Sequence, residues 1–73
     1  MTMAFSYDKL RGRIVEKYGS QTRFANALGV STKTLSFKMN NRIYFSQAEI
    51  KKAADLLDIN LKDIDTYFFT LNV

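Results

Sequence analysis

The chain has 73 residues, a net charge of +4 and neither cysteine nor histidine. A chain of this length forms one domain, near the lower limit for folding on a single core without staples. The missing residue types exclude a disulfide framework, a thiolate nucleophile and the commonest metal ligands and general bases. We therefore expect no enzymatic activity, no cofactor and no metal site. No apolar run is long enough to span a bilayer and no signal peptide is visible, so a cytoplasmic protein is expected.

The positive charge is concentrated in one half of the chain. Residues 1–42 hold eight Lys and Arg against Asp8 and Glu16, whereas residues 43–73 hold three Lys against five acidic residues. A basic half of this kind is typical of phosphate binding, although it is equally typical of an ordinary solvated surface.

The first helix is predicted to open at Phe5-Ser6 and to end at Tyr18-Gly19. Ser6 is the predicted N-cap, and Leu10 and Ile14 recur at helical spacing on the buried side. Lys9, Arg13 and Lys17 line another face, which we interpret as solvent-exposed.

Residues 21–40 contain the most informative pattern in the chain, QTRFANALGVSTKTLSFKMN. Ser20 can cap one short helix and Ser31 a second, with the turn between them at Gly29, the residue type that most readily adopts a positive φ. Phe24, Ala25 and Leu28 share one face of the first helix, and Leu35 and Met39 share one face of the second. The pattern predicts a helix-turn-helix.

This stretch resembles the DNA-binding unit of the phage Cro and repressor (XRE-like) family. The resemblance lies in Gln21, Phe24, Ala25, Leu28, Gly29-Val30 and Leu35, followed by the small and basic run from Ser31 to Leu35. It implies an all-α fold, a five-helix lambda-repressor-like DNA-binding domain over residues 1–73. The chain departs from the family at Lys38, where an apolar residue is usual. This departure leaves open which of Phe37, Lys38 and Met39 faces DNA.

The resemblance also assigns the site residues. It places the second helix of the unit in the major groove of double-stranded DNA, where its side chains reach the base edges. The candidates for base contacts are Thr32, Lys33, Ser36 and Phe37. The candidates for phosphate contacts are Gln21, Arg23, Ser31, Lys38, Asn40, Asn41 and Arg42.

Three further segments follow the motif. Ile43, Tyr44 and Phe45 are too apolar for a free loop, so at least two of them are expected to pack beneath the motif. The run S-Q-A-E at residues 46–49 is a capping box and predicts the clearest helix start in the chain. Asn60 is the predicted cap of a short fifth helix.

The C-terminal tail, residues 67–73, alternates apolar and polar residues from Phe69 onward, which indicates an extended strand. One interpretation is that Phe69, Leu71 and Val73 pair with a symmetry mate and form a homodimer, because an unpaired strand needs a partner. The alternative is that the aromatic residues fold back onto the core of the monomer. We expect Phe68 to do the latter.

The sequence as a whole predicts a dimeric repressor that binds a short inverted-repeat operator in the nucleoid of a bacterial host, with no membrane partner and no small-molecule ligand. A second interpretation is a protein-interaction module, an antitoxin or anti-repressor, that uses its aromatic tail and keeps the helix-turn-helix as a scaffold.

Overall fold

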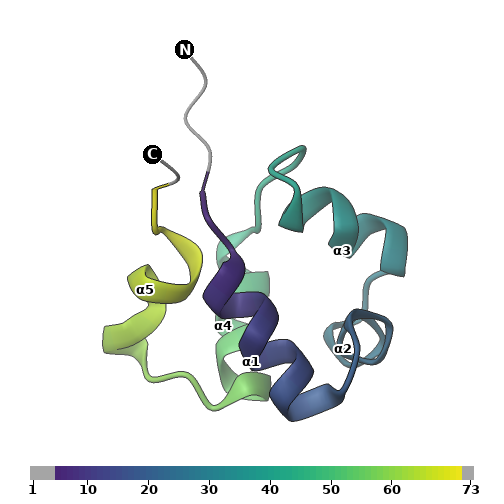
Figure 1. Cartoon of the computed structure of the whole chain (residues 1–73), viewed down its shortest axis with the longest axis horizontal. Coiled ribbons are helices and arrows are strands. Elements are labelled where there is room, and N and C mark those ends of the chain that lie inside the picture. The colour runs from purple at the N-terminus through teal and green to yellow at the C-terminus, as the bar shows by residue number, and fades with distance from the viewer. Residues whose placement is uncertain (1–4, 72–73) are drawn as a thin grey trace.

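The computed structural model describes residues 5–71, which form a single helical unit (Figure 1). Its elements are α1 (Asp8–Tyr18), α2 (Gln21–Leu28), α3 (Thr32–Met39), α4 (Gln47–Leu57), the 3-10 turn η1 (Leu61–Asp63) and α5 (Ile64–Phe68). The predicted all-α fold with five helices is confirmed. Among the described residues, no helix is long and apolar enough to cross a membrane.

Serine side chains start three of the helices as predicted. The hydroxyl of Ser20 accepts from the backbone N–H of Arg23 at 3.2 Å, and that of Ser31 accepts from Thr34 at 3.0 Å. Ser46 and Glu49 form the complete capping box at the start of α4. Ser6 was predicted to cap α1, but the helix begins later, after Tyr7, and has no side-chain cap.

Asn60 likewise makes no side-chain cap bond, and a turn of 3-10 helix stands between it and α5. The prediction of a side-chain cap at Asn60 is therefore wrong, although the short fifth helix that it marked is present.

The core lies where α1, α2 and α4 face one another and α5 closes one side (Figure 1). Phe24, Leu35 and Phe68 are fully buried there, each with at most 1% of its surface exposed. The burial of Phe68 agrees with the expectation that this side chain closes the core of the monomer. Phe45 packs edge-on against Tyr7 and Phe68, with ring centroids 5.6 and 5.3 Å apart, and so joins the α3–α4 loop to both ends of the chain.

The turn between α2 and α3 depends on Gly29. Its φ of +91° lies in the left-handed region, and its N–H donates to the carbonyl of Ala25 at 2.9 Å. Because side chains with a Cβ are strained at this φ, the glycine ends α2 and lets the chain restart three residues later as α3. The predicted pair of short helices over residues 21–40 is thus present.

A buried ammonium group links α3 to α4. The side chain of Lys38 is 7% exposed, and its Nζ donates to Glu49 Oε1 at 2.8 Å and to the carbonyl of Tyr44 at 3.0 Å. Glu49 Oε1 also accepts from the N–H of Ser46 at 2.8 Å. One carboxylate therefore caps α4 and neutralises Lys38, which fixes the path of the α3–α4 loop (residues 40–46).

The two ends of the described chain meet each other. Phe5 and Leu71 form an isolated antiparallel bridge, and the N–H of Ser6 donates to the carbonyl of Thr70 at 2.7 Å. Within residues 5–71 the tail does not form a regular strand. Helix α5 runs to Phe68, and of the described residues after it only Leu71 makes a β-bridge. This corrects the prediction of an extended strand from Phe69, of which Val73 lies outside the described residues.

Gly12 supplies a test of helix propensity in α1. It is exposed, and a Cβ placed on it meets nothing within 4 Å. We expect Gly12→Ala to raise the free energy of unfolding by about 1 kcal/mol, because Gly costs that much relative to Ala inside a helix. Urea denaturation monitored by circular dichroism measures it. Gly29→Ala, at positive φ, is the matched control and must destabilise; a gain in stability at Gly29 would contradict this account.

Removal of the buried ammonium group tests the link between α3 and α4. Lys38→Ala leaves the carbonyl of Tyr44 and the carboxylate of Glu49 without this donor, so we expect a loss of about 1–3 kcal/mol in the free energy of unfolding. Lys51→Ala is the control, because its pair with Asp55 is exposed on both sides and exposed pairs contribute little. Equal losses in the two variants would refute a special role for Lys38.

The same link predicts a pH dependence. Burial alone would raise the pKa of Glu49, but its hydrogen bonds with Lys38 and Ser46 and the charge of Lys38 lower that pKa overall. A lowered folded-state pKa gives stability that is present at neutral pH and is lost as the pH falls below about 4.3, the usual Glu value. The stability advantage over Glu49→Gln must therefore shrink in acid. Asp58, whose pKa is lowered by Lys17, is present in both proteins and cancels. A difference that stays constant with pH would contradict the assignment.

Candidate functional site

The four candidates for base contacts lie on α3, where Lys33 and Phe37 are on the side opposite the buried Leu35. Thr32, Lys33 and Phe37 are exposed and Ser36 is half-buried. Ser36 is also engaged within the helix end, because its carbonyl and hydroxyl accept from Nδ2 of Asn40 at 2.9 and 3.3 Å. Three of the four predicted side chains are therefore exposed, and two of them, Lys33 and Phe37, lie against each other.

Phe37 lies between two cations on this surface. Lys33 Nζ is 5.7 Å and Arg42 Cζ is 5.8 Å from the centroid of its ring, which are cation–π distances. Lys33 stands one turn earlier on α3, and Arg42 is held nearby because its N–H donates to the carbonyl of Phe37 at 2.8 Å. We call these three residues the cation–aromatic cluster.

Lys38 was predicted to contact phosphate, and the structure contradicts this. Its ammonium group is buried and bonded to Glu49 and Tyr44, so it faces the interior of the protein. The physical reason is that Lys38 occupies a position where the Cro and repressor family has an apolar side chain, and Glu49 lies opposite its ammonium group and neutralises it. Lys38, where the sequence departs from the Cro and repressor pattern, thus stabilises the fold.

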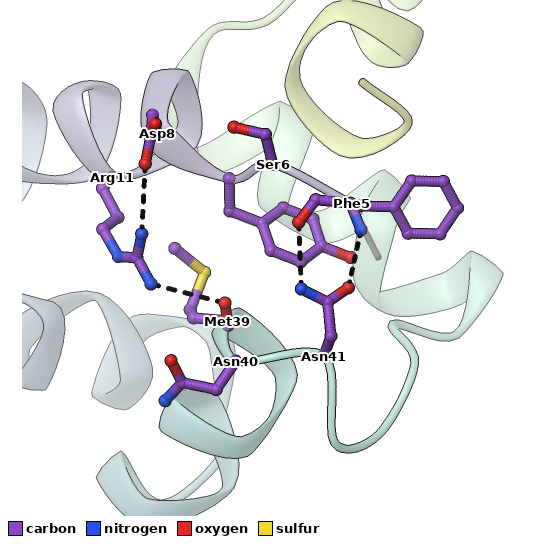
Figure 2. A pocket seen from close by; sticks show the side chains of 8 residues that line it. Phe5, Ser6, Asp8, Arg11, Met39, Asn40 and Asn41 are labelled. Carbon is purple, nitrogen blue, oxygen red and sulfur yellow. Dashed lines mark hydrogen bonds and ion pairs between the residues drawn. The ribbon is translucent and has the colours of Figure 1, made fainter. Parts of the chain in front are cut away.

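The two asparagine side chains that were predicted to contact phosphate are used within the protein. Figure 2 shows the carboxamide of Asn41 facing the backbone of Phe5, accepting from its N–H and donating to its carbonyl, both at 2.9 Å. Asn41 has a φ of +63°, which turns its side chain toward the N-terminal arm (residues 5–7). Asn40 donates to Ser36. These amides are therefore committed to the protein's own backbone and side chains, against the prediction.

The other phosphate candidates are scattered. Ser31 accepts from its own helix, Gln21 is half-buried, and Arg23 is exposed at the start of α2. Arg42 lies against Phe37, on a different part of the surface from the start of α2. Of the seven candidates, Arg23 and Arg42 are the exposed cations that make no ion pair among the described residues.

The tail residues that were predicted to mediate dimerisation are open to solvent in this single chain. Phe69 is 48% exposed and Leu71 45% exposed. Phe69 packs edge-on against Phe5 at 5.7 Å between ring centroids. The tail therefore has an apolar surface, which it shares with the N-terminal arm.

Tyr44 extends this surface onto the α3–α4 loop. It is 77% exposed, and Ile43 is 42% exposed, so only Phe45 of the three residues packs into the core. The expectation that at least two are buried is wrong, because the bond from Lys38 to the carbonyl of Tyr44 holds the loop with these side chains outward. Burial raises the pKa of Tyr7, and the charge of Tyr44 raises it further.

We call Phe5, Tyr44, Phe69 and Leu71 the apolar end surface. Its residues come from three segments that meet where Asn41 bonds Phe5 and where Thr70 bonds Ser6. Analysis of the sequence identified Phe69 and Leu71 but missed Phe5 and Tyr44. The signal was present for Tyr44, since the run from Ile43 to Phe45 is unusually apolar for a loop.

Metal binding and an enclosed ligand site find no support in the described part of the chain. The chain has no His and no Cys, so Asp and Glu are the metal-ligating residues to consider. In the described part of the chain, no three of them lie close enough together to hold an ion. An open pocket beside the start of α1 is lined by Asp8, Arg11 and the Asn40-Asn41 pair (Figure 2). Arg11 is already bonded to Asp8 and to the carbonyl of Met39.

Comparison with known proteins identifies the family. No curated protein matches the chain. Among solved structures, it is similar to the solution structure of the modulator of repression (MOR) of the temperate bacteriophage TP901-1 from Lactococcus lactis. The TM-score is 0.80 and the identity 43%, over 89% of this chain and 88% of that one. These findings support a likeness to a phage regulatory protein, without singling out the Cro and repressor family. Residues 3–71 match the family described as "Protein of unknown function (DUF739)", and the chain therefore belongs to that family.

Proposed function

We propose that this protein is a phage regulatory protein that modulates repression by binding another protein through its apolar end surface. The observation that carries the proposal is the exposure of three large apolar side chains, Tyr44, Phe69 and Leu71, together with the half-buried Phe5, on segments that meet at one end of the molecule. The similarity to a modulator of repression over most of the chain supports the regulatory role.

The apolar end surface suits protein binding because it is prepared before a partner arrives. Asn41 fixes the backbone of Phe5, and Thr70 fixes that of Ser6, so Phe5 and Phe69 are held against each other. Aromatic side chains dominate binding energy at protein interfaces, and an ordered surface loses less conformational entropy on binding. The α2–turn–α3 unit is in this proposal a scaffold that carries the α3–α4 loop.

The proposed activity is binding without catalysis. Five of the seven acidic residues form ion pairs within the protein: Asp8, Glu16, Glu49, Asp55 and Asp58. The proposed site of action is the bacterial host cell in which a phage regulator works.

A second candidate function is binding of operator DNA by α3. The capped helices on either side of the Gly29 turn and the exposed Thr32, Lys33 and Phe37 favour it. Against it stands the internal use of Lys38, Asn40 and Asn41. These three residues are among the seven candidates for phosphate contacts, and phosphate contacts supply a large share of the affinity for DNA.

Binding to the repressor encoded by the same phage tests the proposal. We expect the wild-type chain to bind that purified repressor and the double variant Phe69→Ser/Leu71→Ser to bind it at least about thirtyfold more weakly, because truncation of an interface hot spot costs about 2 kcal/mol or more. Isothermal titration calorimetry measures both affinities, and circular dichroism confirms that the variant is folded.

Leu61→Ser is the matched control, because Leu61 is 70% exposed and lies on η1, outside the apolar end surface. Equal binding by the tail variant and the wild type would reject this surface. A different result would instead favour the second candidate. In that case the wild-type chain does not bind the repressor but tightly retains one sequence from pooled DNA duplexes, and Lys33→Ala no longer retains that sequence.

A further inference from the structure

We propose that the cation–aromatic cluster of Lys33, Phe37 and Arg42 is a recognition site for an acidic segment of the partner protein. The inference rests on the proposed function and deepens it, because it names the chemistry of the partner and a second part of the interface. Three observations carry it: the distribution of carboxylates, the placement of the two cations, and the position of the cluster beside the apolar end surface.

The segment of the chain that carries the cluster contains no acidic residue. Residues 17–48 include no Asp or Glu, although they include Lys17, Arg23, Lys33, Lys38 and Arg42. Lys17 is paired with Asp58 and Lys38 with Glu49. Lys33 and Arg42 make no ion pair within residues 5–71, so their charges are left for a carboxylate supplied from outside.

Phe37 holds these two charges in place. Its ring, 37% exposed, lies within 6 Å of both cations, and such contacts contribute about 0.5–1 kcal/mol at exposed sites. Because the long side chains of Lys33 and Arg42 rest on a common ring, they lose less rotamer freedom when a ligand binds. A guanidinium group can bind a carboxylate with two hydrogen bonds, and the ammonium group of Lys33 can neutralise a second carboxylate nearby.

The cluster adjoins the apolar end surface. Arg42 follows Asn41, whose carboxamide bonds the backbone of Phe5 (Figure 2), and precedes the exposed pair Ile43 and Tyr44. A partner that covers Tyr44 therefore reaches Arg42 along the same loop. An apolar centre with charges at its edge is the usual composition of a protein interface.

A protein fits this site better than DNA does. A row of phosphates needs several donors along one path, whereas the amides of Asn40 and Asn41 and the ammonium of Lys38 are bonded internally. The side chains that stand in the open instead are Phe37, Ile43 and Tyr44. Two cations interleaved with three apolar side chains match an apolar segment with two or more carboxylates.

Selection from a displayed library of random 16-residue peptides tests the proposal. The immobilised wild-type chain is expected to enrich peptides with at least two Asp or Glu next to apolar residues. The double variant Lys33→Glu/Arg42→Glu is expected to bind the same synthetic peptide about two- to thirtyfold more weakly, the effect of losing two exposed ion pairs. The weakening must diminish as salt is raised, because salt screens exposed charges.

The control is Lys9→Glu/Lys62→Glu, which makes the same change in net charge with two exposed lysines outside the cluster. An equal loss in the control, enrichment of neutral or basic peptides, or no enrichment would overturn the proposal. Binding of pooled DNA duplexes that depends on Lys33 and Arg42 would also overturn it. The same holds if sedimentation shows that the wild-type chain self-associates and that only the cluster variant does not. If the tail variant still loses repressor binding, only this inference fails and the proposed function stands.

Discussion

The buried ammonium group of Lys38 is the constraint on which the exposed face of this protein depends. A charge out of contact with water must be compensated, and Glu49 does so while also capping α4. The ammonium group also donates to the carbonyl of Tyr44, and this bond fixes the loop between α3 and α4. With the loop held in this path, Phe45 enters the core, Tyr44 and Ile43 face solvent, and Arg42 reaches Phe37. Packing inside the molecule thus determines what the surface can bind.

Asn41 extends this constraint to the ends of the chain. Its carboxamide bonds the N–H and the carbonyl of Phe5, as a neighbouring strand would. The C-terminal tail pairs with the same N-terminal arm through the bridge between Phe5 and Leu71. As a result, segments from the start, the middle and the end of the sequence meet and carry the residues of the apolar end surface. In a domain this small, such a surface is conspicuous, because much of the available apolar area is needed for the core.

The helices were largely predictable from the sequence, because capping and periodicity are local properties. Ser20, Ser31, the Ser46 to Glu49 box and Gly29 each act within a few residues, and each behaves as the local rules predict. Two local predictions failed, the side-chain caps at Ser6 and Asn60. The predictions for the site failed where distant residues decide the outcome. The inward direction of Lys38 depends on Glu49 eleven positions later, and the use of Asn41 depends on Phe5, 36 positions earlier.

The same distinction applies to the candidate site. The groove-facing residues of α3 were assigned from a local motif, and Thr32, Lys33 and Phe37 are exposed as that motif implies. The apolar end surface is assembled by long-range contacts, so analysis of the sequence found only its tail. The apolar run from Ile43 to Phe45 marks Tyr44 within its own segment. Phe5 gains its role from its two hydrogen bonds with Asn41, which no pattern within its own segment specifies.

Amide chemical-shift mapping with the repressor of the same phage tests the central claim most directly. The account predicts that shifts on complex formation cluster in residues 5–6, 42–45 and 69–71 and around Phe37, while the exposed start of α2 changes little. The contradicting result is that duplex DNA, and not the repressor, produces the shifts, and that these shifts are confined to the start of α2 and the exposed side of α3.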